Sequence, residues 1–180
     1  MEINNVLEKV ASLLDLPDDV VSEESSDEKC LNQLVLAFNN VLCEVAEEYL
    51  PFYKTEKLVS FGGKIAYADF SERVYKIKGL SDQTDKKVKF KQKAEYLEVA
   101  EDGEYEITYT YLPKEVEFGG TVDTPINLSE RTMAYGVAGE FALITGRYDD
   151  SVNYDGRFSG AISASRRGVK ERRLPYRRCL

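Results

Sequence analysis

The side-chain types that most often perform catalysis or bind metals are scarce in this sequence. Histidine is absent, which removes the usual general base, the serine–histidine–aspartate arrangement and the commonest metal ligand. The three cysteines, Cys30, Cys43 and Cys179, form no CxxC pair, so neither a zinc site nor a disulfide framework is indicated. We therefore expect no metal, no cofactor and no catalytic residues.

Carboxylates are the remaining candidates for catalysis. A hydrolase could use two of them as acid and base, and the candidates for such a pair are Glu44, Glu47, Glu48 and Glu140. With 32 Asp and Glu in 180 residues, however, chance pairs are expected. For Glu140, which lies among small residues, a contact between helices is the preferred interpretation. A carboxylate hydrolase is kept as a weaker alternative.

Two double-glycine sites, Gly62-Gly63 and Gly119-Gly120, could suggest phosphate loops. Neither is followed by Lys and Ser or Thr, and neither has the spacing of a dinucleotide-binding motif. We interpret them as turns.

The C-terminal segment is strongly basic and also carries apolar residues. The last fifteen residues hold seven Lys and Arg side chains and one Glu, whereas the whole chain has a net charge of −8. Such an acidic chain with a basic end is typical of an interaction arm. The residues that we predict to dock on a partner are Arg166, Arg167, Lys170, Arg172, Arg173, Leu174, Tyr176, Arg177, Arg178 and Leu180.

Three interpretations of this tail are open. Arginines beside Tyr176 could bind nucleic acid, because they neutralise phosphates and the ring stacks on bases. The acidic body would repel a polyanion, and the apolar anchors Leu174 and Leu180 favour a protein groove instead. Docking on a protein is therefore preferred, with nucleic-acid binding and a merely solvated tail as alternatives.

Periodicity predicts the elements that would position these groups. Apolar residues at helical spacing predict helices over residues 2–14, 27–49, 130–145 and about 149–167. In the third of these, Gly136, Gly139 and Ala142 leave a small surface on which another helix could pack.

Between the helices, from 54 to 112, the pattern changes to period two and predicts antiparallel strands. Tyr105, Ile107, Tyr109 and Tyr111 should share one face of a strand. The segment VYKIKGL (74–80) should alternate, and Asp102-Gly103 should turn a hairpin.

The fold class that we predict is α+β. Four main helices, two N-terminal and two C-terminal, should flank a small antiparallel β-insertion at about 54–112, with an extended basic tail at the C-terminus. We expect residues 1–165 to form a single domain and residues 166–180 to form the docking tail. The first residues do not have the pattern of a signal peptide, and no apolar run is long enough to span a membrane, so folding in a reducing cytoplasm is expected.

Three stretches resemble the head–tail connector, or adaptor, proteins of tailed bacteriophages. They are EYEITYTYLPKEVEF (104–118), PINLSERTMAYGVAGEFALITGRYDDSVNYDGRFSGAISASRR (125–167) and the Arg-rich end. The family pattern has a strand with a Tyr-x-Tyr-x-Pro-like ending, a Ser-capped helix and a tail that ends in Arg-Arg and an aromatic or apolar residue. Here the tail ends in Arg177-Arg178-Cys179-Leu180, which differs from the frequent Arg-Arg-Trp ending.

The resemblance implies a structural virion protein that is not an enzyme. It implies a ring, of twelve copies, beneath the portal of the phage head, with the C-terminal tail docked on the portal protein and the β-rich loops facing tail or neck proteins. Viral DNA would pass through the ring without specific binding, and no membrane would be involved. The protein would be assembled in the host cytoplasm and reside in the virion at the head–tail interface.

Overall fold

The structure is a computed structural model that describes residues 1–17, 19–22 and 27–166. Within these residues it contains four α-helices and two small antiparallel sheets, so the predicted α+β class is confirmed. The helices are α1 (Ile3–Leu14), α2 (Glu28–Glu44), α3 (Glu130–Ile144) and α4 (Tyr148–Arg166). The predicted extended tail lies outside the described residues, apart from Arg166 at the end of α4.

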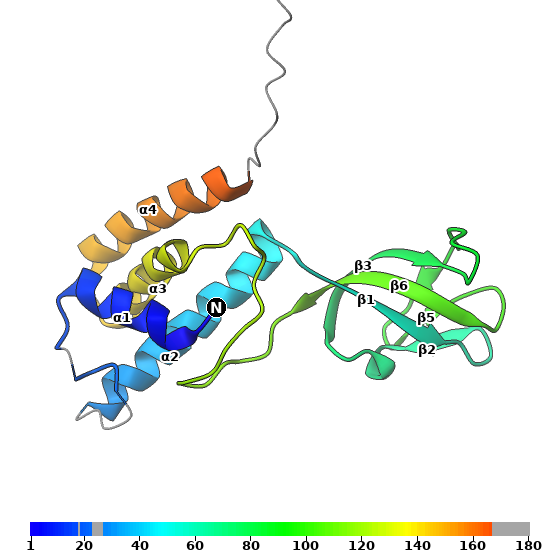
Figure 1. Cartoon of the computed structure of the whole chain (residues 1–180), viewed down its shortest axis with the longest axis horizontal. Coiled ribbons are helices and arrows are strands. Elements are labelled where there is room, and N and C mark those ends of the chain that lie inside the picture. The colour runs from blue at the N-terminus through cyan, green and yellow to red at the C-terminus, as the bar shows by residue number, and fades with distance from the viewer. Residues whose placement is uncertain (18, 23–26, 167–180) are drawn as a thin grey trace, which may run out of the picture.

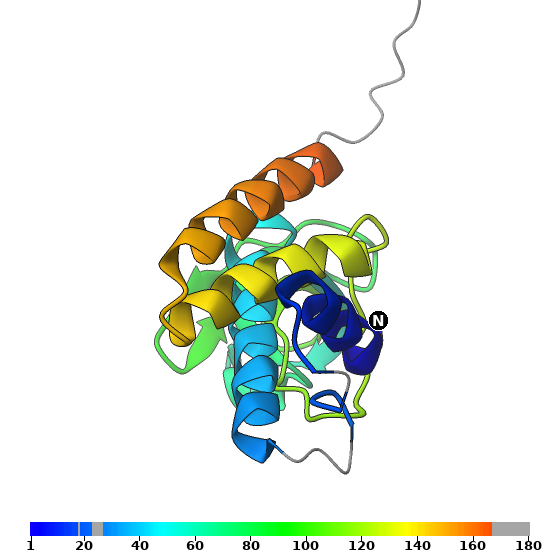
Figure 2. The same ribbon diagram turned by 90° about the vertical axis from the view of Figure 1, so that its left-hand side faces the viewer.

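The four helices form one part of the molecule, which we call the helical part. α3 lies at its centre and packs against the other three helices, with α4 on the outside (Figures 1 and 2). Local signals fix the starts of α2 and α3. Asp27 accepts a hydrogen bond from the Cys30 N–H at 3.0 Å, and Ser129 accepts one from the Thr132 N–H at 3.1 Å. α2 continues through a π-helical turn (Val45–Tyr49) before Pro51.

The strands form a second, elongated part, which we call the β part and which projects from the helical part (Figure 1). Its strands are β1 (Phe52–Val59), β2 (Lys64–Ala66), β3 (Arg73–Ser81), β4 (Lys91–Gln92), β5 (Tyr96–Glu98) and β6 (Glu104–Leu112). They pair in the orders β1-β6-β3 and β2-β5-β4. The expectation of one small sheet is therefore corrected to two, and residues from both sheets share one hydrophobic cluster.

The predicted apolar face of β6 is confirmed. Tyr105, Ile107 and Tyr109 are buried, and Tyr111 is half-buried. The residues between them, except Thr110, are more exposed, as expected for a strand with one face on a core.

The predicted hairpin at Asp102-Gly103 is wrong. The strands on either side of it, β5 and β6, belong to different sheets. The Asp102 carboxylate instead accepts hydrogen bonds from the backbone N–H groups of Gly62 and Gly63, at 3.1 and 2.7 Å. These two glycines have positive φ angles, 59° and 70°, and form the tight turn between Phe61 and Lys64. Asp102 therefore caps a turn that is distant in sequence.

The expected alternation of VYKIKGL is also wrong. β3 pairs with β6 through two register shifts, one at Tyr75 and one at Lys78, so that each adds an unpaired residue. As a result Val74, Ile77 and Leu80 lie opposite Tyr111, Tyr109 and Ile107. The inward residues of β3 thus recur every third position, because a bulge shifts the side-chain alternation by one.

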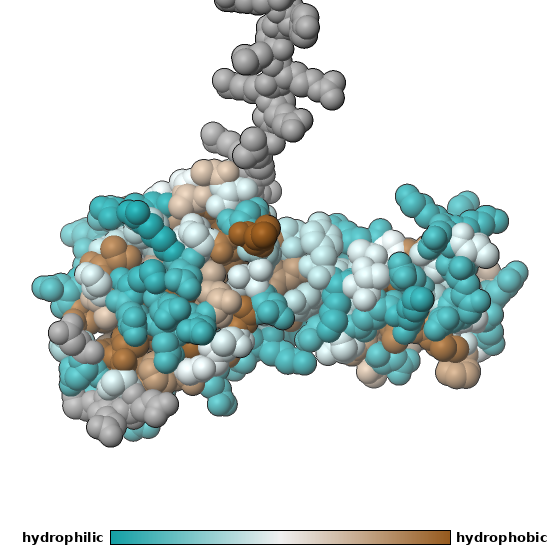
Figure 3. Space-filling view, in the orientation of Figure 1, coloured by the Kyte–Doolittle hydropathy of each residue, from teal (hydrophilic) through white to brown (hydrophobic). Residues whose placement is uncertain are grey.

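The two parts are joined at a narrow neck. β1 pairs with β6 along its whole length, from Phe52 opposite Tyr111 to Val59 opposite Glu104. The chain therefore enters the β part through β1 and leaves it through β6 at the same place. The Phe52 and Tyr111 rings meet edge to face, 5.9 Å between centroids, and Tyr111 packs against the hydrophobic clusters of both parts. In the view of Figure 3, hydrophilic residues cover most of both parts, and hydrophobic residues form small patches among the hydrophilic ones.

Candidate docking surfaces and helix contacts

The small residues that were predicted to pack helices lie in the interior of the helical part. A Cβ on Gly136 would approach Val41 of α2 to 2.7 Å and Phe158 of α4 to 3.0 Å. A Cβ on Gly139 would come 3.3 Å from the backbone nitrogen of Asp155, and Ala142 is completely buried. The absent side chains let α2 and α4 lie close to α3.

The predicted docking tail begins where α4 ends. The Asn127 side-chain amide donates to the Ser165 carbonyl at 3.1 Å, which ties the last turn of α4 to the loop before α3. In the same loop, Ile126 is fully exposed. Of the predicted docking residues, Arg166 is the last residue of α4, and Arg167, Lys170, Arg172, Arg173, Leu174, Tyr176, Arg177, Arg178 and Leu180 lie outside the described residues.

Three of the four candidate carboxylates come together on one edge of the helical part. Burial raises the pKa of Glu44, and the charges of Glu48, Asp155 and Glu140 raise it further, against a hydrogen bond with Tyr49 that lowers it. Glu140 accepts a hydrogen bond from the Asn40 amide at 2.9 Å. We call Glu44, Glu48, Glu140 and Asp155 the acidic edge.

The acidic edge is open to solvent. Glu48 and Asp155 are exposed, and none of the four carboxylates forms an ion pair with a described cation. The contact between Glu140 and Asn40 agrees with the preferred interpretation of Glu140 as a contact between helices. The fourth candidate, Glu47, is exposed on the π-helical turn at the end of α2.

A cationic and aromatic cluster lies on the other flank of α3. The guanidinium of Arg131 lies over the Tyr135 ring at 5.6 Å, and Arg157 from α4 lies 6.0 Å from the same ring and 5.4 Å from that of Tyr154. Neither arginine forms an ion pair with a described carboxylate. The sequence alone does not reveal this cluster, because its members are far apart in the chain and have no motif in common.

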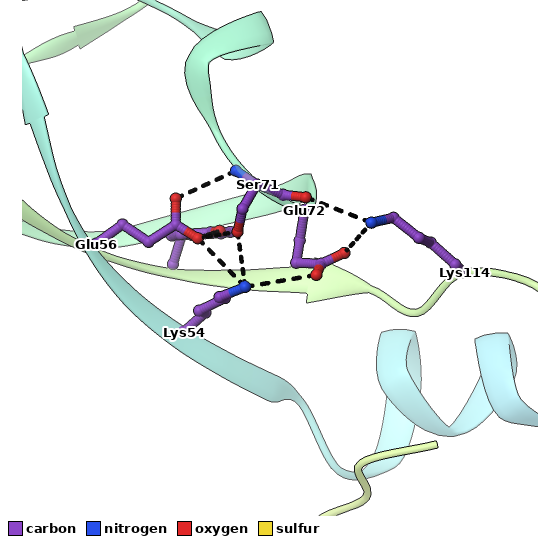
Figure 4. A network of polar contacts seen from close by, with 6 residues as sticks. Lys54, Glu56, Ser71, Glu72 and Lys114 are labelled. Atoms are coloured by element: carbon purple, nitrogen blue, oxygen red, sulfur yellow. Dashed lines mark hydrogen bonds and ion pairs between the residues drawn. The ribbon is translucent and has the colours of Figure 1, made fainter. Parts of the chain in front are cut away.

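A network of charged and polar side chains lies beside the neck (Figure 4). Glu72, just before β3, is 3.4 Å from the Lys54 ammonium of β1 and 3.2 Å from that of Lys114, which follows β6. Lys54 also donates to the Ser71 hydroxyl at 2.6 Å. The network thus ties together the segments through which the chain enters and leaves the β part.

Glu56 continues this network into the β part. It accepts hydrogen bonds from the Ser71 hydroxyl, the Ser71 N–H and the Tyr109 hydroxyl. Burial acts to raise the pKa of Glu56, but these hydrogen bonds outweigh it and the pKa is lowered. The same environment, first burial and then the bond to Glu56, raises the pKa of Tyr109 to about 12.

None of the described helices is long and apolar enough to cross a membrane. Comparison of the chain with protein-family models gives no match, and comparison with curated proteins gives none either.

Proposed function

We propose that this chain is a structural subunit of the head–tail junction of a tailed bacteriophage, where it joins the portal protein to tail or neck proteins. The observation that supports this best is the arrangement of the molecule in two parts (Figure 1). In the chain, α4 of the helical part is followed by the Arg-rich segment, and the β part projects from the helical part. A connector needs two separate contact regions of this kind.

The proposed roles follow from this division. The tail binds the portal, with arginines on carboxylates and Leu174, Tyr176 and Leu180 in apolar pockets. The loops of the β part face the tail proteins. Copies form a ring of twelve, and DNA passes through its channel without specific binding, since the chain has a net charge of −8 and does not attract a polyanion. The subunit has no enzymatic role, is assembled in the host cytoplasm and remains in the virion.

Deleting residues 169–180 tests the docking role of the tail. We expect the shortened chain to keep the circular dichroism spectrum and thermal unfolding of the full chain, and to lose binding to purified portal rings of the phage that encodes it. A matched variant, Leu174→Ser with Tyr176→Ser, keeps every charge and should also bind more weakly, because the apolar anchors contribute much of the affinity.

Two outcomes would contradict docking on the portal. If the shortened chain binds portal rings with unchanged affinity, the tail is not the docking element. If it instead loses a salt-dependent affinity for double-stranded DNA that the full chain has, the tail is a nucleic-acid-binding segment.

A further inference from the structure

The helical part has a groove between α1 and α3 that no described segment of the chain fills. It has a volume of about 380 Å³ and is lined by Glu8, Lys9, Ser12, Leu13, Arg131, Ala134 and Tyr135. Leu13 is half-buried, Ala134 is buried and the Tyr135 ring is half-buried, so the floor of the groove is apolar. Such a groove can receive the edge of a helix.

Charge at the groove is available for a partner. Lys9 is already paired with Glu130 at 2.8 Å, and Glu8 adds a negative charge on the α1 wall. Arg131 on the α3 wall contacts the Tyr135 ring and hydroxyl, and Arg157 lies beside the Tyr135 and Tyr154 rings. Neither arginine forms an ion pair with a carboxylate of the described residues. These contacts use few of the five N–H donors of each guanidinium, so donors remain for carboxylates.

A complementary surface exists on the same chain. Tyr148, Val152 and Asp155 are spaced by four and three residues, so they lie along one edge of α4. Tyr148 and Val152 are 67% and 75% exposed, which is high for large apolar side chains without a partner. Asp155 at the end of this row belongs to the acidic edge.

The two surfaces face in different directions. Asp155 and Arg157 are two residues apart on α4, and Arg131 and Glu140 are nine residues apart on α3. At about 100° per residue, each pair lies on nearly opposite sides of its helix. A single copy therefore cannot bring its acidic edge to its own groove, whereas two copies side by side can.

We propose that the α1–α3 groove of one copy receives the α4 edge of a second copy. Tyr148 and Val152 of the second copy fill the apolar floor, and its acidic edge meets Arg131 and Arg157. The contact uses two different surfaces, so it repeats from copy to copy and produces a closed ring or an open chain. This proposal deepens the proposed function, because it names the contact between neighbouring subunits of the ring.

Paired charge reversals test the contact. One variant carries Arg131→Glu and Arg157→Glu, and the other carries Glu48→Arg and Asp155→Arg. Sedimentation velocity of the full chain at low salt and at the highest soluble concentration should show self-association of the wild type. Each variant alone should self-associate at least about tenfold more weakly, because like charges now face each other. An equimolar mixture should regain association, since in an assembly that alternates the two variants opposite charges meet at every contact.

The control variant, Lys89→Glu with Lys91→Glu, changes the net charge as much as the first variant but on the exposed surface of the β part. It should associate like the wild type. Recovery in the mixture also shows that both variants are folded. A wild type that stays monomeric, variants that associate like the wild type, or a mixture that fails to associate would overturn the proposal.

Binding to portal rings, measured on the same proteins, separates this result from the proposed function. If portal binding occurs but the charge reversals have no effect on association, the contact is wrong and the connector role stands. If portal binding fails, the proposed function is wrong whatever the association shows.

Discussion

At the scale of single residues, the most informative groups are carboxylates that fasten the β part. Glu56 has a lowered pKa, so its hydrogen bonds stabilise the folded state when it is charged. Its contribution is therefore complete above the pKa of the unfolded chain and is lost as the pH falls through the lower pKa of the folded state.

Glu56→Gln should lower the free energy of unfolding at pH 7 by about 1–2 kcal/mol, as expected for loss of a charge-assisted hydrogen bond at a largely buried site. Urea unfolding at pH 7 and at pH 3 would show the difference from wild type shrinking at the lower pH. Glu95→Gln is the control, since Glu95 is exposed and should change stability by less than about 0.5 kcal/mol at either pH. An equal effect of Glu56→Gln at both pH values would contradict this account.

Asp102 gives a second prediction at this scale. The N–H groups of Gly63 and Gly62 lower its pKa, so these bonds weaken as the pH falls through that pKa. In Asp102→Ala, the amide protons of Gly62 and Gly63 should exchange with solvent faster than in the wild type. Amide exchange measured by NMR would show this, and unchanged rates would mean that the carboxylate does not hold the turn.

At the scale of elements, helix packing depends on the small residues of α3. Gly139→Leu should lower the free energy of unfolding by about 1–3 kcal/mol, because the new side chain would collide with the backbone of α4. Gly156→Leu is the matched control, since nothing lies within 4 Å of a Cβ at that position on α4. It should stabilise the monomer by up to about 1 kcal/mol through helix propensity. If both variants have the same effect in thermal unfolding, close packing at Gly139 is refuted.

Much of the secondary structure was predictable from the sequence. α1 has strong apolar periodicity, α2 and α3 have capping residues, and β6 alternates strictly, so local pattern was sufficient for them. α4 is less amphipathic, but Tyr154, Phe158 and Ile162 recur at a spacing of four residues and mark its buried face. The sheet arrangement was not predictable. The bulges at Tyr75 and Lys78 break the alternation of β3. In β1, the half-buried positions 54 and 56 carry the charged residues Lys54 and Glu56, so the sequence of β1 does not show an apolar face. Asp102-Gly103 has the sequence of a hairpin turn, but the strands on either side of it, β5 and β6, pair with other strands and not with each other.

Some of the candidate contact surfaces were likewise predictable from the sequence, and others were not. Gly136 and Gly139 could be recognised as packing residues because they lie within one helix. The groove with Arg131 and Arg157 depends on how α1, α3 and α4 assemble, and no spacing within one element reveals it. The tail could be recognised by composition, but its partner depends on another protein.

At the scale of the whole molecule, the neck determines how the two parts can act together. The paired β1 and β6, the Phe52–Tyr111 contact and the Glu72 network hold together the segments through which the chain enters and leaves the β part. A connector that transmits a fixed orientation from portal to tail would benefit from such a neck.

The most direct test of the connector role is the native mass of purified portal rings mixed with an excess of the full chain. If the chain is a connector, a discrete complex should form in which each portal ring gains the mass of twelve copies, with the β parts projecting from one end in electron micrographs. Portal rings that keep their own mass in the presence of the chain would contradict it.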